Sequence, residues 1–523
     1  MMETKQKHKG LTVVITLVLA ILLPLLSAPV TFAEEVESDF ALKIDDTEYS
    51  TSDLNFVTAN NFFRITQIPA FTPEGQMKLN EMVADEKGNM RSIREVLIDA
   101  ARSQLQDVHV LLKQAKEANM ELDEADAASV EKFFENINNY AKAQNTETDE
   151  VLRNIFGPEA TEESIRPLLE DTMLVSSYQR ELVKNYEFEE KELEDLYQEK
   201  PEEFDLVSFR SLTFHAIDPS EQNVEEEQEE ADMESLMKEA SAKANDFLKK
   251  IKDEESFIKE AIPYVPADLQ EALKGTDFTL NLNQPHSVLQ KHFAEWLFDK
   301  ERKEGDTVIL ESPSAYSVLY FINRGRDETP VFSARHLLFQ QDLMAEDQEA
   351  AKGEVLKLAG EAKKEFEEGE QSEEAFTELV LKYSDDEYSA KNGGLYENIL
   401  PGTVVPEFEN WCLDPARKEG EVGMIYVEAE RYSGAHLIYF LGLGNPSWQA
   451  RAKEILREDR FIAELDKARE ELTIVEGDGY ANILQAATEE SNQEEVVEVE
   501  SVEEEELETE AAESEETEET EAN

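Results

Sequence analysis

The chain has 523 residues, enough for about three ordinary domains, and 40% of them are apolar, so most of it can build packed cores. It carries 119 Asp and Glu residues against 50 Lys and Arg, a formal net charge of -69. A surface of this charge repels nucleic acid and anionic membranes, so we expect no DNA or RNA partner.

The N-terminus has the order of features that marks an export signal. Three lysines in the first nine residues precede an apolar run over 11–26, and small and helix-breaking residues lead to Ala33. This order predicts a signal peptide, residues 1–33, cleaved near Ala33. The alternative is an uncleaved anchor, because residues 11–33 are just long enough to span a bilayer. Either way, the sequence predicts a protein that is secreted or anchored at the outer face of the cell membrane.

Residues 34–200 predict a helical domain. Apolar residues recur with the helical period in four segments: 92–118, 125–143, 166–186 and 189–198. Pro167 would lie in the first turn of the third helix, where proline is tolerated. Neither His, Cys nor a Gly-rich loop is arranged here for chemistry, so a binding role is expected.

The pattern then changes to strands mixed with helices, and the same order of elements occurs twice. The first copy, 201–328, predicts strands at 204–214, 307–310 and 316–323 and a helix at 233–251. The second copy, 329–445, predicts strands at 333–339 and 431–441 and helices at 348–366, 371–383 and 406–412. The fold class expected for the chain is therefore a multidomain α+β protein.

The two copies also share identical residues at identical spacing. The first copy has Phe293, Trp296, Asp299, Arg302 and Gly305, and the second has Phe408, Trp411, Asp414, Arg417 and Gly420. Each closing strand carries a Tyr-Phe pair, Tyr320-Phe321 and Tyr439-Phe440. These matches predict an internal duplication.

Two segments follow the second copy. Residues 446–475 predict a C-terminal helix, whereas half of residues 488–523 are Glu and none is Lys or Arg. Such a tail buries too little apolar surface to fold, so we expect a disordered, solubilising segment. Weak contacts with calcium or the cell wall are the alternatives for its role.

The single cysteine, Cys412, excludes an intramolecular disulfide. It follows Trp411 in an apolar stretch, which favours packing in a core over a role as a nucleophile.

A set of motifs carries the chemistry of the second copy. In chain order they are strand-His336, Ser384-Asp385-Asp386, Asn392-Gly393-Gly394, Pro406-Glu407-Phe408-Glu409 and strand-His436. With these motifs, residues 331–444 resemble the parvulin family of peptidyl-prolyl isomerases. The resemblance implies an enzyme that rotates X-Pro peptide bonds with neither cofactor nor metal.

The resemblance also implies roles for individual residues. His336, Asp386 and His436 would be catalytic, and the substrate proline would be bound by Tyr396, Val404, Phe408 and Ser433. Tyr396 stands where family members carry a leucine, and Val404 where they carry a methionine, so the shape of the pocket differs from the family pattern. A metal site made of His336, His436 and Asp386 is the alternative, against which the resemblance argues.

Alignment of the first copy with the second puts Ser211 and Ser317 at the two histidine positions, so we expect an inactive copy. An active and a silent copy behind a helical domain resemble the extracytoplasmic foldases of the PrsA and SurA type. The resemblance implies clients that are unfolded or newly exported polypeptides containing X-Pro bonds. Two rival interpretations are a non-catalytic holdase chaperone that keeps the parvulin scaffold, and a structural envelope protein that displays an acidic tail.

Overall fold

The computed structural model describes residues 40–85, 88–216, 229–265, 277–429 and 432–485. The predicted signal segment and acidic tail lie outside these residues. The described residues fold as two units, one made of those in 40–182 and 464–485, the other of those in 183–463. Within the described ranges, we find no helix with the length and apolar character needed to cross a membrane.

The first unit is built mainly from six helices. They are α1 (Thr51–Thr66), α2 (Pro73–Leu79), α3 (Ile93–Glu117), α4 (Glu124–Gln144), α5 (Thr148–Phe156) and α6 (Glu162–Lys184). Ser50 and Ser92 begin α1 and α3 with reciprocal capping boxes, in which the serine hydroxyl and the third residue's carboxylate satisfy backbone N–H groups. Local capping therefore fixes where the two helices start.

The first unit also contains short strands that helical periodicity did not predict. β1 (Leu42–Ile44), β2 (Thr47–Tyr49) and β13 (Ile474–Glu476) form one antiparallel sheet, and β3 (Met82–Ala84) with β4 (Met90–Ser92) forms a hairpin. Each strand has only three residues, too few for an alternating pattern to be visible.

The prediction for Pro167 was wrong, because α6 begins four residues earlier than expected. Thr161 and Ser164 exchange side-chain to backbone hydrogen bonds of 2.9 and 3.1 Å, which starts the helix at Glu162. Pro167 consequently lies inside α6, where it removes one helical hydrogen bond.

The C-terminal segment returns to the first unit. Helix α16 (Ser447–Glu470) was predicted, and its Arg469 forms two hydrogen bonds of 2.5 and 2.6 Å with the buried Asp107 of α3. β13 then pairs with β1, and the buried Leu484 donates its N–H to Asn55 at 2.7 Å. These contacts make the end of the described chain part of the core of the helical unit.

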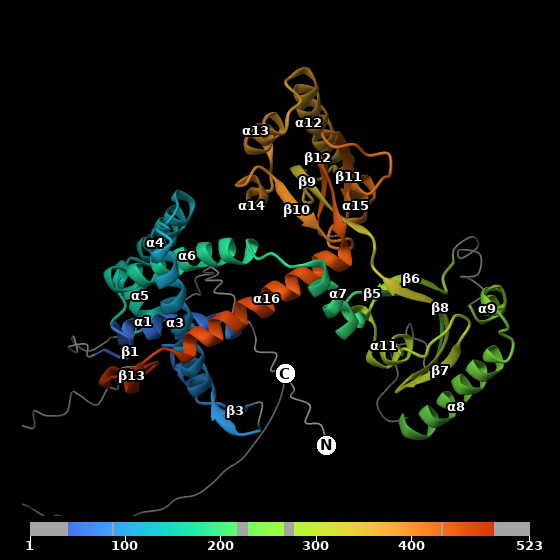
Figure 1. Cartoon of the computed structure of the whole chain (residues 1–523), viewed down its shortest axis with the longest axis horizontal. Coiled ribbons are helices and arrows are strands. Elements are labelled where there is room, and N and C mark those ends of the chain that lie inside the picture. The colour runs from blue at the N-terminus through green and yellow to red at the C-terminus, as the bar shows by residue number, and fades with distance from the viewer. Residues whose placement is uncertain (1–39, 86–87, 217–228, 266–276, 430–431, 486–523) are drawn as a thin grey trace, which may run out of the picture. The chain divides into compact units, whose positions relative to one another are not determined.

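The second unit contains two four-stranded antiparallel sheets of the same topology (Figure 1). The first, in spatial order, has β6 (Leu280–Pro285), β5 (Asp205–His215), β8 (Ala315–Arg326) and β7 (Thr307–Ser312). The second has β10 (Leu395–Ile399), β9 (Pro330–Gln340), β12 (Ser433–Pro446) and β11 (Val422–Glu428). Identical strand order is what an internal duplication predicts.

Matching helices connect the strands of the two sheets. The first sheet has α8 (Glu229–Leu248), α9 (Glu254–Ala261) and α11 (Lys291–Leu297). The second has α12 (Gln348–Glu368), α13 (Glu373–Tyr383), α14 (Glu387–Ala390) and α15 (Pro406–Cys412). Before the first sheet lie α7 (Glu190–Glu199) and the 3-10 turn Pro201–Glu203.

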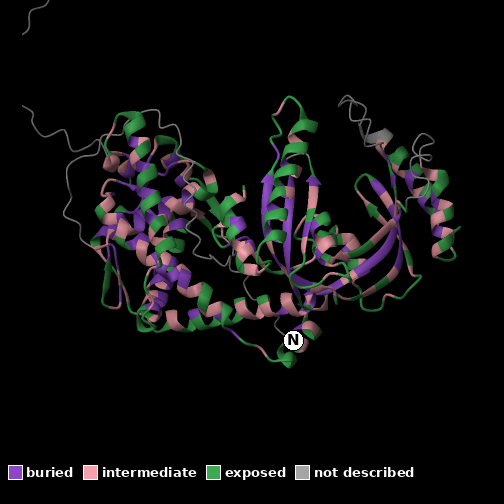
Figure 2. Cartoon of the chain, turned by 90° about the horizontal axis from the view of Figure 1, so that it is seen from above, coloured by how far each residue is buried: buried purple, intermediate pink, exposed green. Residues whose placement is uncertain are grey.

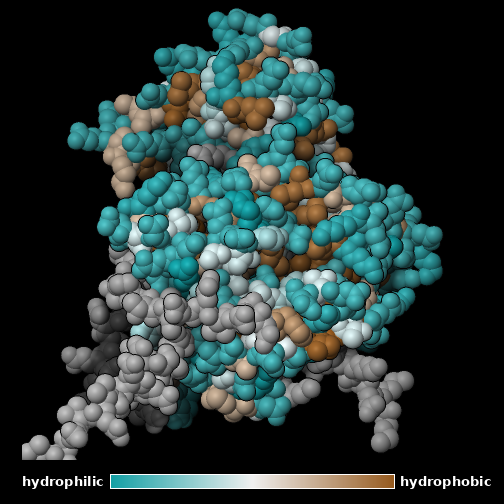
Figure 3. Space-filling view, turned by 90° about the vertical axis from the view of Figure 1, so that its left-hand side faces the viewer, coloured by the Kyte–Doolittle hydropathy of each residue, from teal (hydrophilic) through white to brown (hydrophobic). Residues whose placement is uncertain are grey.

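The second sheet is buried on both faces, and alternate residues serve different cores. Leu337, Phe339, Ala435 and Leu437 pack with the helices α12 and α13. Phe332, Ala334, Ile438 and Phe440 pack with α15 on the other face. Figure 2 shows the buried central strands against helices that are exposed on their outer sides. The molecular face in Figure 3 is mostly hydrophilic with smaller apolar areas, as the charge of the chain leads one to expect.

Candidate active site

Two histidines lie side by side on the central strands of the second sheet. His336 of β9 is paired with Ile438, and His436 of β12 with Leu338, so the two side chains are diagonal neighbours on one face. Their rings stack with centroids 4.8 Å apart, and His336 Nε2 lies 2.7 Å from His436 Nδ1. Both side chains are buried, with 7% and 5% exposure.

The histidine pair lies between a tyrosine to which it is hydrogen-bonded and a carboxylate at ion-pair distance. The Tyr432 hydroxyl lies 2.5 Å from His436 Nε2, and an Asp386 carboxylate oxygen lies 3.8 Å from His336 Nδ1. The Asp386 carboxylate favours a proton on the nearby His336 Nδ1, and this tautomer sets which atoms donate and which accept in the remaining hydrogen bonds. His336 Nε2 then accepts from His436 Nδ1, and His436 Nε2 accepts from Tyr432.

Burial keeps both imidazoles neutral. It lowers the pKa of His336 to about 4, although the charge of Asp386 acts in the opposite direction. It lowers the pKa of His436 to about 3, with a further contribution from the neighbouring His336. Burial also raises the pKa of Tyr432, so its hydroxyl keeps the proton that it donates.

Asp386 is the charged and partly exposed end of this polar chain. The residues before it hold it beside β9, because Leu338 donates its N–H to Ser384 Oγ at 3.2 Å and Gln340 donates to Asp385 at 2.9 Å. Burial opposes ionisation of Asp386, but hydrogen bonds from the side chain and backbone of Ser389 outweigh it and lower the carboxyl pKa. The Ser389 hydroxyl donates to Asp386 at 2.6 Å.

The double glycine brings this loop against the histidine strand. Gly393 and Gly394 have φ values of +66° and +70°, which favour glycine. A Cβ on Gly394 would lie 2.1 Å from the backbone oxygen of His336, and His336 donates its N–H to Gly394 at 2.8 Å. Arg335 donates to the Gly393 carbonyl at 3.0 Å and secures the loop from the other side.

An apolar cluster adjoins the histidines. The buried ring of Phe408, on α15, meets His336 edge-on at 5.8 Å and His436 at 6.5 Å between ring centroids. Val404 and Tyr396 pack against the same cluster. The structure therefore brings three of the four predicted pocket residues together beside the predicted catalytic residues.

Tyr396 also takes part in the polar chain, which a leucine at this position does not allow. Its ring meets His336 edge-on at 5.9 Å, and its hydroxyl donates to Asp386 at 3.4 Å. Asp386 thus receives hydroxyl groups from Ser389 and Tyr396 while facing His336.

Cys412 is 1% exposed in the same apolar cluster, and burial raises the pKa of its thiol to about 12. The thiol is therefore protonated at neutral pH and packs in the core. This confirms the prediction made from its apolar neighbours.

The structure does not bring Ser433 into the site. Ser433 is an odd number of residues from His436 and thus lies on the opposite face of β12, where its hydroxyl donates to the Ala429 carbonyl at 3.4 Å. Sequence reasoning missed Tyr432, which reaches His436 instead. The signal was available, because residues four apart in an extended segment share a face.

The corresponding positions of the first sheet hold hydroxyl groups. Ser211 is paired with Leu319 as His336 is with Ile438, and Ser317 with Thr213 as His436 is with Leu338. Asn281 donates to Ser211 at 3.0 Å, and the hydroxyls of Thr213 and Ser317 lie 2.8 Å apart. The strand register thus agrees with the sequence alignment at both positions.

Comparison with known families identifies the segment that carries the histidine pair. Residues 336–441 match the Rotamase family model, described as the PPIC-type PPIASE domain. This segment is a parvulin domain. Both histidines, Asp386 and the apolar cluster around Phe408 lie within it.

Two curated relatives share a longer part of the chain. Chaperone SurA of Nitrosococcus oceani is 26% identical over 237 residues, which cover 43% of this chain and 51% of that protein. Chaperone SurA of Hahella chejuensis is 27% identical over 235 residues, covering 44% and 50%. The chain therefore spans about half the length of these relatives.

Solved structures of related description align only loosely. Peptidylprolyl isomerase PrsA of Bacillus anthracis has 17% identity and a TM-score of 0.19, covering 44% of this chain and 92% of its own. A solved structure described as one of two SurA-like chaperones of Campylobacter jejuni has 17% identity and a TM-score of 0.16. That alignment covers 47% of this chain and 83% of the other. PrsA of Bacillus subtilis has 12% identity and a TM-score of 0.15, and the alignment covers 58% of this chain and 91% of that protein. At these TM-scores the alignments do not describe the arrangement of the whole chain.

The groups of the parvulin domain suit rotation about a peptide bond. The barrier to rotation, about 18–20 kcal/mol, arises from amide resonance, and no bond has to break. A change from tens of seconds to milliseconds requires roughly 10⁴- to 10⁵-fold acceleration, or about 5.4–6.8 kcal/mol. An apolar pocket that holds the proline ring, beside fixed dipoles that favour the twisted carbonyl, can supply stabilisation of this kind.

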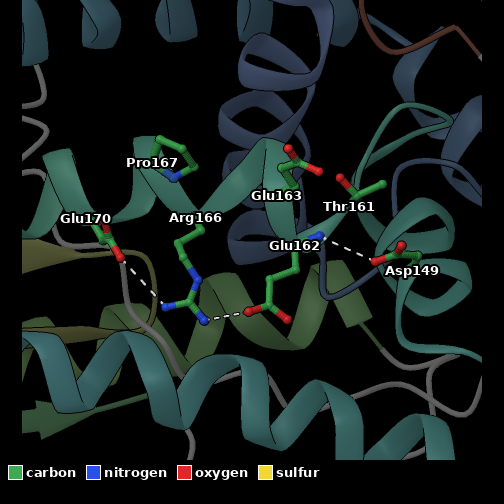
Figure 4. A pocket seen from close by; sticks show the side chains of 7 residues that line it. All are labelled: Asp149, Thr161, Glu162, Glu163, Arg166, Pro167 and Glu170. Atoms are coloured by element: carbon green, nitrogen blue, oxygen red, sulfur yellow. Dashed lines mark hydrogen bonds and ion pairs between the residues drawn. The ribbon is translucent and has the colours of Figure 1, made fainter.

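Two other features bear on the choice of site. Nowhere in the described ranges are three or more His, Cys, Asp or Glu side chains grouped to hold a metal ion. The helical unit has a pocket of about 620 Å³, lined by Asp149, Thr161, Glu162, Glu163, Arg166, Pro167 and Glu170 (Figure 4). Arg166 forms ion pairs there with Glu162 and Glu170 at 2.5 and 3.6 Å, so the cation that lines the pocket is paired with two of its four carboxylates.

Proposed function

We propose that the protein is an extracytoplasmic foldase whose parvulin domain catalyses cis-trans isomerisation of X-Pro bonds. Its substrates are unfolded or newly exported polypeptides. The protein is secreted, or attached to the outer face of the membrane through its apolar N-terminus. Similarity to two proteins named Chaperone SurA supports the folding role, and the match to the PPIC-type family supports the isomerase activity.

The observation that carries the proposal is the neutral histidine pair between an apolar cluster and an ionised carboxylate. Phe408 and Val404 would hold the proline ring. Asp386 and the histidines would provide a fixed polar field beside the rotating bond. His336, His436 and Asp386 are accordingly assigned catalytic roles, and Tyr396, Val404 and Phe408 substrate binding.

The remaining segments have supporting roles in this proposal. Residues 34–200 and the C-terminal helix hold the unfolded client, and residues 201–328 form a non-catalytic parvulin-like domain. Ser211 and Ser317 support the second assignment, because two hydroxyl groups replace the stacked imidazoles.

The test is a prolyl isomerisation assay on short X-Pro peptides with the chain that begins at Glu34. His336→Ala and His436→Ala should each lower kcat/KM about 10- to 100-fold while circular dichroism stays unchanged. Ser211→Ala is the matched control from the first sheet and should leave the rate unchanged. Equal rates in the parent and both histidine variants would remove the site assignment.

A non-catalytic holdase is the second candidate, and it is favoured by Tyr396. This side chain replaces a pocket leucine and directs a hydroxyl group to Asp386, which changes both the space and the polarity beside the proline. The same assay separates the candidates, because a holdase prevents aggregation of an unfolded protein but does not accelerate X-Pro exchange. We also expect no preference for phosphorylated Ser or Thr before proline, because residues 340–348 carry neither Lys nor Arg.

A further inference from the structure

The site of the parvulin domain adjoins two segments that are rich in carboxylates and poor in cations. Residues 340–347 begin at the end of β9, and residues 384–409 contain the proposed catalytic carboxylate and the pocket residues. Gln340 joins the two segments by donating its N–H to Asp385 at 2.9 Å. Together they carry nine Asp or Glu residues and a single cation, Lys391, whereas the whole chain has 119 acidic and 50 basic residues. The charge around the site is therefore more one-sided than the charge of the chain.

The cations on the elements beside these segments are already paired. Every Lys and Arg of β9, α12 and α13 lies 2.8 to 3.7 Å from a carboxylate. The pairs are Arg335 with Glu373, Lys352 with Glu428, Lys357 with Glu361, Lys363 with Glu367, Lys364 with Glu368 and Lys382 with Glu365. Lys391 lies at the opposite end of α14 from Asp386. These cations leave the surplus of negative charge at the site in place.

The negative charge of Asp386 acts across the whole site. Burial raises the pKa of Tyr396 and of Tyr432, and the charge of Asp386 raises both further. A substrate group that brings a positive charge to this place is stabilised, and one that brings a negative charge is destabilised.

Tyr388 adds an aromatic ring next to this carboxylate. Its N–H donates to Asp386 at 3.2 Å, which fixes its backbone at the start of α14. Its side chain is 88% exposed, and among the residues that the structure describes it is the one exposed aromatic side chain. After burial and Asp386, it also contributes to the raised pKa of Tyr396, so its hydroxyl lies within electrostatic reach of the site. The face of such a ring attracts a Lys or Arg side chain.

The residue that precedes the substrate proline lies close to these groups. Phe408 and Asp386 both adjoin His336, with 5.8 Å between ring centroids and 3.8 Å from the carboxylate to Nδ1. Consecutive Cα atoms are only about 3.8 Å apart across a trans peptide bond. When Phe408 holds the proline ring, the side chain of the preceding residue X therefore begins beside the pocket and within reach of the carboxylate.

We propose that the parvulin site prefers X-Pro bonds in which X is Lys or Arg, with Asp385 and Asp386 attracting the cation and Tyr388 packing against it. This inference rests on the proposed isomerase activity and names the substrates that the site selects. The long stem of Lys or Arg covers apolar surface of the pocket while its charged end extends to the carboxylates. An acidic residue at X is repelled by the same groups, and salt weakens both effects.

The test measures kcat/KM of the chain that begins at Glu34 on three peptides that differ only at X, which is Lys, Leu or Glu. Ratios between peptides are compared, because a general loss of activity cancels in a ratio. Asp385→Asn removes one charge at the site and keeps an oxygen that can accept from Gln340. Glu354→Gln is the matched control, which removes one charge from α12 on the opposite face of the sheet from the pocket. Tyr388→Leu keeps an apolar side chain but removes the aromatic ring.

The parent should isomerise the Lys peptide about 10-fold more efficiently than the Glu peptide at low salt, with the Leu peptide between them. This ratio should fall at high salt. Asp385→Asn should lower the Lys-to-Glu ratio about 3-fold, and Glu354→Gln should leave it unchanged. Tyr388→Leu should lower the Lys-to-Leu ratio about 2- to 5-fold.

Three outcomes would overturn parts of this proposal. Equal efficiency on the three peptides, or a preference for Glu, removes the selection of cations while the isomerase activity stands. Equal effects of Asp385→Asn and Glu354→Gln remove the assignment to the site carboxylates, and an unchanged Lys-to-Leu ratio in Tyr388→Leu removes Tyr388. A parent that isomerises none of the peptides overturns the proposed isomerase function together with its preference.

Discussion

The two sheets of the second unit keep the same supports around different central groups. In the first sheet Arg302 lies 4.0 Å from the Trp296 ring and donates to the Trp296 carbonyl at 3.1 Å. In the second, Arg417 lies 3.8 Å from the Trp411 ring and donates to its carbonyl at 3.0 Å. In both sheets the arginine stabilises the end of the short helix that carries the tryptophan, α11 or α15. This contact is the same whether serines or histidines occupy the central strands.

The central positions differ in burial cost and in chemistry. Hydroxyl groups at Ser211 and Ser317 are small, neutral at every pH and satisfied by Asn281 and Thr213. The imidazoles of His336 and His436 are large, stacked and held neutral only by burial. The first sheet shows that this scaffold folds without histidines at these positions. The second sheet buries two neutral imidazoles, and this burial lowers its stability in acid. That cost is expected where residues serve a function.

The largest difference between the two sheets should be in how much their stability decreases in acid. Free histidine titrates near about 6.5, whereas His336 and His436 titrate at about 4 and about 3 in the folded protein. Between these values the unfolded chain binds protons that the native state does not, so the free energy of unfolding falls as pH falls. At pH 5 the loss is about 2 kcal/mol for each histidine, because one pH unit corresponds to about 1.4 kcal/mol.

Amide hydrogen exchange with mass spectrometry can measure this difference in the intact chain. Protection factors of β9 and β12 should decrease between pH 7 and pH 5 more than those of β5 and β8. The excess should disappear when His336→Gln and His436→Gln are combined, because no imidazole remains to titrate. An equal decrease in both sheets of the parent would contradict the pKa directions.

A methyl group at Gly394 should have a smaller but still local effect. Gly394→Ala forces a side chain onto a φ of +70° and places its Cβ against the His336 backbone. We expect a loss of about 2–4 kcal/mol in the free energy of unfolding, together with a lower isomerisation rate.

Gly305→Ala is the matched control from the first sheet. Gly305 also has a positive φ, +87°, but the nearest atom to a Cβ there is the Tyr320 hydroxyl at 3.7 Å. Only the backbone term of about 1–2 kcal/mol remains, and the isomerisation rate should not change. Urea unfolding and the peptide assay measure both effects, and equal losses in the two variants would show that contact with His336 is unimportant.

The sequence predicted the central elements of the fold well, because long segments express their period. The strand expected at 333–339 is β9, Pro330–Gln340, and the helix expected at 348–366 is α12, Gln348–Glu368. It did not predict the three-residue strands of the helical unit or the pairing of β1 with β13. That pairing joins residues more than 400 positions apart and depends on the whole fold.

For the site, motif order located the histidines, Asp386 and Phe408 but not every hydrogen-bond partner. Ser433 was assigned through the resemblance, as the polar residue beside the second histidine, yet the alternation of β12 places it on the opposite face from His436. Tyr432 was overlooked although the strand predicted at 431–441 includes it. Residues four apart in a strand share a face, so strand alternation, which residue type alone does not give, was the signal that could have found it.

Removal of the Tyr432 hydroxyl should have the smallest effect and test the direction of the hydrogen-bonded chain. Tyr432→Phe leaves the ring edge against His436 but removes the donor to Nε2. The loss in the free energy of unfolding should be about 1 kcal/mol, as for one buried hydrogen bond. Without that donor, His436 can exchange its tautomer, so kcat should fall a few-fold while KM stays the same.

Thr213→Val provides the control, because it removes the hydroxyl that partners Ser317 in the first sheet. Its stability loss should be similar, and the isomerisation rate should be that of the parent. Nitrogen-15 NMR of the histidine rings adds a readout that a purely structural role does not move. In the parent, Nε2 of His436 should show the shift of an unprotonated, hydrogen-bonded nitrogen, and that shift should change in Tyr432→Phe but not in Thr213→Val. A protonated Nε2 in the parent would reverse the chain from Tyr432 to Asp386, and His336 Nδ1 would then face the carboxylate without a proton.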